Sequence, residues 1–151
     1  MTTPSFNDAM IDDFNWAREK YGKDVLFYEV HTTLSGYIDE LPLNQIHVVC
    51  DTAIFEKPHE QKIYVARNFD KGIRHTFTAP PGWEGSEQFN PYDIRVYFKE
   101  AVRIFAESSV KNKHISVMTF RHILDPKYEH PMYIFGRVAG VDAVTGDVIP
   151  L

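Results

Sequence analysis

Two short triplets are the parts of the chain best suited to acid-base chemistry. In each triplet a hydroxyl side chain lies two residues after a histidine. The triplets are His31-Thr32-Thr33 and His114-Ile115-Ser116. Residues two apart on a β-strand point to the same face, so each triplet would present an imidazole beside a hydroxyl. An imidazole can act as a general acid or base, and a hydroxyl can donate a hydrogen bond to a phosphate oxygen. The catalytic candidates are therefore His31, Thr33, His114 and Ser116.

This pair of triplets is similar to the signature of the two-histidine phosphoesterase family, whose two motifs lie on paired lobes of a duplicated α/β fold. His31-Thr32-Thr33-Leu34 matches the H-x-T-L pattern of that family, and residues 114–117 follow it loosely. The resemblance implies hydrolysis of a cyclic or 2′,5′-linked nucleotide, with one imidazole as general base and the other as general acid. The two rings would then lie within about 5 to 8 Å of each other across a cleft. Aligning the two halves of the chain does not pair the two histidines, because only His31 falls deep inside its strand.

The other potential ligands and nucleophiles form no cluster in the sequence. Cys50 is the single cysteine and lies in the apolar run Ile46–Cys50, which favours a buried, inert thiol. His122 and His130 flank a predicted turn, and neither an H-x-x-x-H pair nor a glycine-rich phosphate loop is present. We therefore expect no metal site and no cofactor.

Residues 68–89 are rich in glycine, proline and polar side chains, with only a short extended piece at Thr76–Ala79. They predict a long connection, and loops above about 12 to 15 residues are usually functional or mobile. The stiff Pro80-Pro81-Gly82 segment would present Trp83 at a low cost in entropy, as binding hot spots do. We expect Arg74, Trp83 and Phe89 to contact a protein partner, unless Trp83 folds back over the seam between the two halves.

A first helix is predicted from about Phe6 to Tyr21, because its apolar residues recur every three to four positions. Ser5 is suited to cap its N-terminus, and Gly22 to end it in a left-handed turn. Segments rich in β-branched and aromatic residues follow and predict three antiparallel strands. These segments are Val25–Leu34, Gln45–Phe55 and Lys62–Arg67.

The second half begins with a helix signal, in which Asn90 is the cap and Pro91 the first helical residue. That helix should end near Ser109, and three further strands should follow at His114–His122, Met132–Val138 and Val141–Leu151. The repeated order suggests a pseudo-repeat of residues 5–67 and 90–151, joined by the loop 68–89. The predicted fold class is α+β: two α-β-β-β units, each with an antiparallel sheet packed on one helix, forming one compact domain over residues 1–151.

The second half combines the helical segment Glu100–Ala106, a strand that begins Met132–Phe135, and an ending that contains Val141-Asp142-Ala143-Val144-Thr145-Gly146. This combination resembles a PepSY module. In that family a helix precedes a small antiparallel sheet that ends in a V-D-A-x-T-G-x-V signature. PepSY modules are thought to bind or restrain partner proteins such as peptidases, so the resemblance implies a protein-binding function.

Composition narrows the classes of partner. The chain has 151 residues, of which 44% are hydrophobic, so it can form the core of one domain. Its 16 basic and 21 acidic residues give a net charge of -5 and form no basic run, which disfavours binding to duplex nucleic acid. No apolar run of about 18 residues and no leader-like N-terminus occurs, which predicts a cytoplasmic protein without a membrane segment.

We interpret the sequence as that of a non-catalytic protein-binding module, namely an inhibitor, immunity or regulatory protein. Its mild acidity is a common means of steering such proteins to their partners. Two alternatives stay open, so the sequence does not decide whether the protein is an enzyme. One is the two-histidine phosphoesterase. The other is a small-molecule binding or isomerase-type pocket that would draw on Tyr28, His47 and Tyr64.

Overall fold

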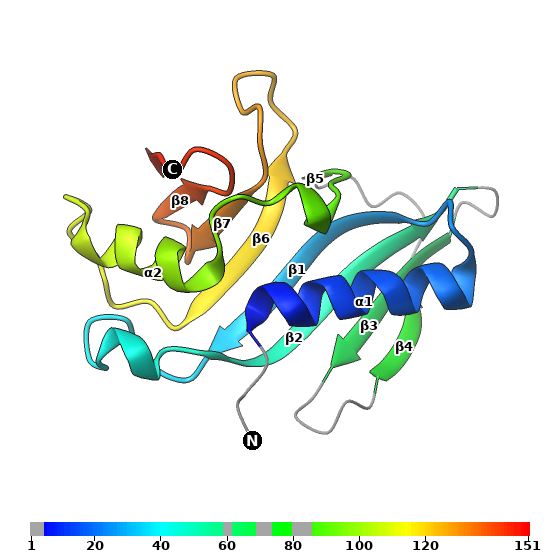
Figure 1. Cartoon of the computed structure of the whole chain (residues 1–151), viewed down its shortest axis with the longest axis horizontal. Helices are drawn as coiled ribbons and strands as arrows, with labels where there is room; N and C mark the ends of the chain where they lie inside the picture. Colours follow the sequence, from blue (N-terminus) through cyan, green and yellow to red (C-terminus); the bar gives the residue numbers. More distant parts are fainter. Residues whose placement is uncertain (1–4, 59–61, 69–73, 80–85) are drawn as a thin grey trace.

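The computed structural model describes residues 5–58, 62–68, 74–79 and 86–151. Within these residues, two α-helices pack on one antiparallel sheet (Figure 1). The helices are α1 (Phe6–Tyr21) and α2 (Phe98–Glu107), with short 3-10 helices η1 (Leu43–Gln45) and η2 (Pro91–Asp93). The strands are β1 (Leu26–Leu34), β2 (Val48–Lys57), β3 (Lys62–Asn68), β4 (Arg74–Ala79), β5 (Ser86–Glu87), β6 (Val117–Ile123), β7 (Met132–Phe135), β8 (Ala139–Asp142) and β9 (Val148–Pro150).

The described strands form a single continuous sheet in the order β4-β3-β2-β1-β6-β7-β8-β9, and β5 pairs with β6. At its centre β1 lies antiparallel to β6, with His31 opposite Thr119 and Glu29 opposite Arg121. The α+β class is thus confirmed, but the prediction of two separate sheets, each on its own helix, is wrong. An exposed strand edge carries unpaired backbone groups, and β1 and β6 satisfy these groups by pairing with each other.

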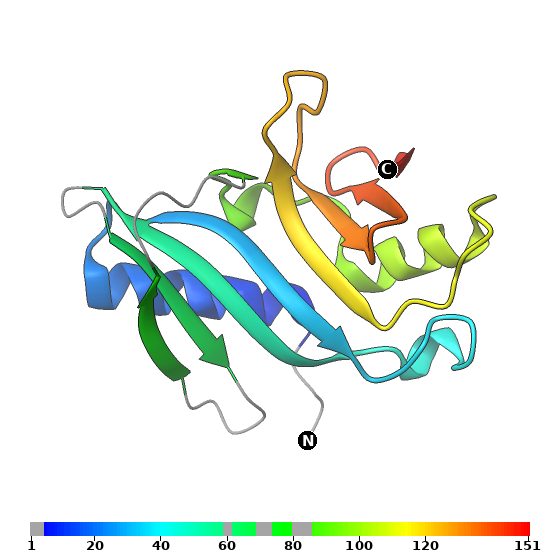
Figure 2. The ribbon, with the colours of Figure 1, turned by 180° about the vertical axis from the view of Figure 1, so that it is seen from behind.

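Both helices cover the same face of the sheet. The main core cluster joins Phe6 and Phe14 of α1 and Phe105 of α2 to the rings of the central strands. Phe14 stacks on Phe27 of β1 at 6.0 Å, and Phe105 stacks on Phe135 of β7 at 4.6 Å. Figure 2 shows the other face, over which neither α1 nor α2 lies. We call this second side the open face.

The first helix forms where the sequence predicts it, and its ends have the expected caps. The Ser5 side chain accepts a hydrogen bond from the Asp8 amide at 3.1 Å. Gly22 takes a positive φ of 105°, and its N–H donates to the Arg18 carbonyl at 2.9 Å. Because local side chains decide both ends, sequence alone predicts the span of this helix.

The second helix begins later than predicted. Asn90 does act as a cap, since its side chain accepts from the Tyr92 amide at 2.9 Å, but only the short η2 follows. Beyond η2 the amides of Arg95 and Val96 both donate to the Ala143 carbonyl, at 2.9 and 2.8 Å. These tertiary bonds interrupt the helix between η2 and Phe98.

The predicted connection 68–89 contains two strands in its described part. β4 pairs along its whole length with β3, from Ile63 opposite Ala79 to Asn68 opposite Arg74. β5 pairs with β6, and the Phe89 amide donates to the Phe27 carbonyl at 3.0 Å. The short extended piece predicted at Thr76–Ala79 lies within β4, and pairing with β3 extends the strand back to Arg74. No helix in the described part of the chain is long and apolar enough to cross a membrane.

Candidate functional site

Four polar side chains meet on the open face where β1 pairs with β6. The register places Glu29 opposite Arg121 and His31 opposite Thr119, and directly opposite residues of antiparallel strands share a face. Val30, between the two β1 residues, is fully buried on the helix side, as the alternation of a strand requires. We call Glu29, His31, Thr119 and Arg121 the polar ladder.

Glu29 is a buried carboxylate, with a relative exposure of 5%. Its Oε2 lies 2.7 Å from His31 Nε2, and the Ser86 hydroxyl donates to its Oε1 at 2.6 Å. Arg121 Nε lies 3.6 Å from the same Oε1. Burial raises the pKa of Glu29, but the hydrogen bonds from His31 and Ser86 and the charges of His31 and Arg121 outweigh it, so the pKa is lowered. Glu29 is therefore ionised at neutral pH.

The buried carboxylate fixes the neighbouring imidazole. Because an ionised carboxylate only accepts, Nε2 of His31 donates to Glu29, and the other ring nitrogen lies 3.3 Å from Thr119 Oγ1. A carboxylate, an imidazole and a hydroxyl thus form a chain, an arrangement that in other proteins can move a proton. Here both ring nitrogens of His31 already have a partner within the protein.

A groove of about 600 Å³, open to solvent, runs beside the polar ladder. Its wall combines cationic, titratable and aliphatic side chains from β1, β6, β7 and the C-terminal end of the chain. It is lined by His31, Val117, Thr119, Arg121, Ile123, Ile134, Gly136, Arg137 and Leu151. A second depression, of about 330 Å³, lies beside α1 and has no titratable side chain in its wall, which makes it the weaker candidate.

Two arginines set the charge of the groove. Arg121 has 29% of its side chain exposed and lies beside the Glu29 carboxylate, which offsets part of its charge. Arg137 is exposed and makes no ion pair with any other described residue. The groove is therefore a local positive site on a protein whose net charge is -5.

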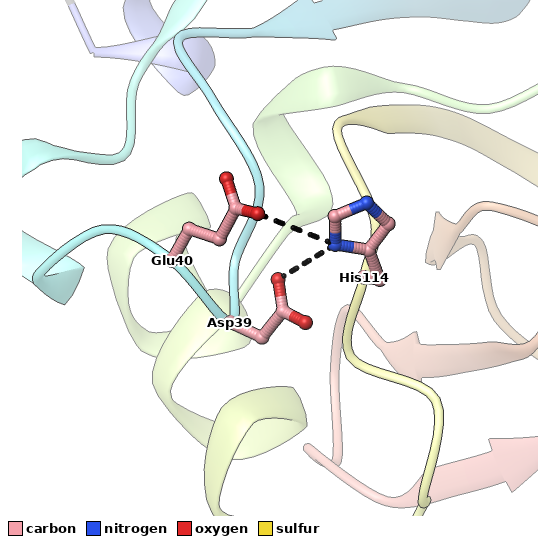
Figure 3. Close-up of side chains that lie close together, drawn as sticks. All are labelled: Asp39, Glu40 and His114. Carbon is pink, nitrogen blue, oxygen red and sulfur yellow. Dashed lines mark hydrogen bonds and ion pairs between the residues drawn. The ribbon is translucent and has the colours of Figure 1, made fainter.

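The two histidines predicted to act together lie in different surroundings. His114 precedes β6, and its Nδ1 lies 3.1 Å from Asp39 Oδ1 (Figure 3). Its ring also stacks on Tyr37 at a centroid distance of 3.7 Å. His31 lies opposite Thr119 in the β1–β6 pair, and Thr119 comes five residues after His114 in the sequence. Between the two described histidines there is no hydrogen bond or ring contact, and each imidazole has partners of its own.

The hydroxyl partners predicted for these histidines are also apart. Thr33 lies on the open face beside His31 and is paired in register with Val117. Ser116 is half-buried and uses its backbone carbonyl to accept from the Leu34 amide at 2.8 Å. The hydroxyl that the structure places against His31 is that of Thr119. Sequence reasoning missed it because cross-strand register, and not spacing along the chain, brings the two together.

The predicted partner-binding residues have three different outcomes. Phe89 is only 9% exposed and packs against Phe27 at 4.8 Å and Phe120 at 4.9 Å, so it is a core residue and no partner can reach it. Arg74 is the first residue of β4. Trp83 lies outside the described residues.

The three side chains of the predicted small-molecule pocket do not converge. Tyr28 donates a hydrogen bond to Glu56 and packs against the small cluster that contains Ile54. Tyr64 stacks on Tyr21 of α1 at 4.1 Å, on the helix side of the sheet. His47 is exposed, with Nδ1 3.2 Å from the Gln45 carbonyl. These positions do not form one cavity wall.

Comparison of this chain with protein-family models, with curated proteins and with solved structures finds no match.

Proposed function

We propose that the protein is a non-catalytic binding module whose groove accepts a segment of a partner protein that carries a carboxylate among aliphatic side chains. The observation that carries this proposal is the unpaired state of Arg137, within the described residues, in the wall of a groove that also exposes aliphatic side chains. Val117 and Leu151 line the same groove and are 50% and 48% exposed, which is high for large aliphatic side chains.

The charges of the groove support an acidic ligand. A guanidinium group binds a carboxylate through two parallel hydrogen bonds, and arginine is enriched at protein interfaces for this reason. Arg137 would make the main contact, because Glu29 already offsets part of the charge of Arg121. A local positive site on an acidic protein also orients an approaching acidic partner.

The contacts of His31 fit a structural role in this proposal, because Glu29 and Thr119 hold its two ring nitrogens. The polar ladder then serves as a rigid floor that holds the groove in shape. The resemblance of the second half to PepSY modules agrees with a protein-binding role.

The test selects peptides from a random library displayed on phage, with the full-length protein as bait. We expect the selected peptides to carry Asp or Glu next to Leu, Ile or Val. Arg137→Glu should weaken binding of a selected peptide at least about tenfold, since it replaces an attraction by a repulsion of similar size. Lys127→Glu is the matched control, because Lys127 is an exposed cation on the β6–β7 loop and is not among the groove residues.

Two outcomes would contradict the proposal. One is a set of peptides without acidic residues, or with an affinity that Arg137→Glu leaves unchanged. The other is hydrolysis of a 2′,3′-cyclic nucleotide by the wild type that disappears in His31→Ala, which would identify an enzyme instead.

A further inference from the structure

A second group of titratable side chains lies away from the groove, where the turn after β1 meets the segment before β6. Asp39 and Glu40 belong to that turn, and His114 belongs to the segment. Figure 3 shows the three side chains converging, with both carboxylates directed toward the same ring nitrogen. One donor atom from each residue can be chosen so that all three lie within 4.8 Å of one another.

We propose that Asp39, Glu40 and His114 form a binding site for a divalent transition-metal ion, with Zn²⁺ as the best fit. The His114 Nδ1 lies 3.1 Å from Asp39 Oδ1 and 3.9 Å from Glu40 Oε1. Zinc bonds of about 2.0 to 2.2 Å in a tetrahedral site separate two ligand atoms by roughly 3.3 to 3.6 Å. These two separations lie on either side of this range and all three donor atoms lie within 4.8 Å of one another, so rotations of the exposed side chains would complete the geometry. The Asp39 contact is a hydrogen bond to Nδ1, so a bound ion would displace the shared proton, which would move to Nε2 or to solvent.

The donor set favours zinc over the hard cations. An imidazole nitrogen with two carboxylates suits Zn²⁺, whereas Ca²⁺ takes about six to eight oxygen ligands and Mg²⁺ prefers oxygen in an octahedron. The three side chains are 40 to 62% exposed, which leaves a fourth position open to water or to a donor from another molecule. Two carboxylates next to each other in sequence also repel, and a dication would relieve that repulsion.

The backbone holds the two segments together without any metal. The Ile38 amide donates to the Ile115 carbonyl at 3.0 Å, and both isoleucines are buried, with exposures of 4% and 6%. Each isoleucine is the direct neighbour of a proposed ligand. The Tyr37 ring lies almost parallel to the His114 ring, at an interplanar angle of 5°, and restricts its rotation. The proposed ligands are thus brought together by the fold, which lowers the cost of binding an ion.

Sequence reasoning expected no metal site, because 74 residues separate Glu40 from His114 and no ligand motif links them. The proposal is independent of the groove, since none of the three residues lines it.

The test is a calorimetric titration of the full-length protein, first treated with a chelator, with zinc chloride. We expect saturable binding of one Zn²⁺ per chain. His114→Ala removes a ligand and Asp39→Asn removes a ligand's charge, so each should lower the affinity at least tenfold, because even changes to outer-shell partners cost about 10- to 100-fold. His47→Ala is the control, because His47 is also an exposed histidine but is not part of the cluster. Circular dichroism should show that each variant remains folded.

Substitution with Co²⁺ gives a second readout, because a tetrahedral cobalt site absorbs visible light much more strongly than the hydrated ion. We expect this absorption in the wild type and in His47→Ala, and its loss in His114→Ala. The proposal is overturned by a dissociation constant for Zn²⁺ weaker than about 1 mM. It is equally overturned by binding that is unchanged in the folded His114→Ala variant, which would place the ion at another histidine.

Discussion

A buried hydrogen-bond chain connects α1, the start of α2 and β7, and its removal gives the sharpest prediction about stability. The Asn7 amide donates to the Tyr133 hydroxyl at 2.8 Å, and that hydroxyl donates to the Val96 carbonyl at 2.7 Å. The Asn7 side-chain oxygen accepts from the Phe98 amide at 2.8 Å. Asn7 is 7% exposed and Tyr133 is fully buried. Burial also raises the pKa of Tyr133, so its hydroxyl stays protonated and can donate.

The magnitude follows from the groups that lose their partners. Tyr133→Phe leaves the Asn7 amide N–H and the Val96 carbonyl without this hydroxyl, and each buried unsatisfied group costs about 1 to 3 kcal/mol, or about 2 to 6 kcal/mol together. Asn7→Leu, of similar size, leaves only the Phe98 N–H without its acceptor, at about 1 to 3 kcal/mol. The double variant has no Asn7 amide. The cost of leaving that amide unsatisfied, which counts in Tyr133→Phe alone, is therefore absent from the double variant. The double variant should therefore be more stable than the sum of the single changes predicts, by about 1 to 3 kcal/mol, which is the cost of the unsatisfied Asn7 amide.

The assay is urea unfolding followed by circular dichroism, with all variants fitted to a common slope. Tyr97→Phe is the control, because the Tyr97 side chain is 62% exposed and its hydroxyl should contribute less than about 0.5 kcal/mol. A free energy of unfolding for Tyr133→Phe within about 0.5 kcal/mol of the wild type would refute the reasoning. If the free-energy change of the double variant equals the sum of the two single changes within about 0.3 to 0.5 kcal/mol, the bond between Asn7 and Tyr133 contributes nothing to stability.

Two further predictions concern the core and the pH dependence of stability. Phe89→Ala should lower the free energy of unfolding by about 3 to 5 kcal/mol, because it opens a cavity between Phe27 and Phe120. A loss below about 1 kcal/mol in urea unfolding would show that Phe89 is not a core residue. Burial raises the pKa of Asp142, but hydrogen bonds from the amides of Thr145 and Val144 and from His130 outweigh it, so the folded pKa lies below the ordinary value of 3.8. The ionised carboxylate therefore stabilises the fold above about pH 4, and this contribution is lost as the pH falls through the folded pKa. Asp142→Asn should be less stable than the wild type at pH 7, with a difference in unfolding free energy that shrinks toward pH 2; a difference that is constant across this range would contradict the assignment.

Local patterns were sufficient for the elements whose ends depend on their own side chains. Ser5 and Gly22 mark the two ends of α1, and the predicted span of Phe6–Tyr21 is confirmed. Gly146, with a positive φ of 81°, likewise lies in the turn between β8 and β9, where a glycine is favoured. In each case the determining contact lies within a few residues along the chain, so the sequence contains the whole interaction.

Register and distant contacts were not predictable in the same way. The start of α2 depends on the Ala143 carbonyl, which lies 47 residues beyond Val96 and has no signature in the helix itself. The candidate site also depends on strand register. The sequence indicates His31 as a site residue but suggests Thr33 and His114 as its partners. The pairing of β1 with β6 instead places it beside Thr119, and alternation of strand faces then adds Glu29 and Arg121.

Short-range periodicity and turn chemistry specify the α+β composition, the first helix with both its caps, and the approximate positions of most strands, so these can be predicted from the amino-acid sequence. The joining of the strands into one sheet, the burial of Phe89 and the place of the polar ladder beside a groove with two arginines are set by the folded chain. The fold also brings Asp39 and Glu40 to His114. All of these depend on which strand edges pair and on which face of the sheet the helices cover, and such choices arise from the packing of the whole chain and not from any one segment.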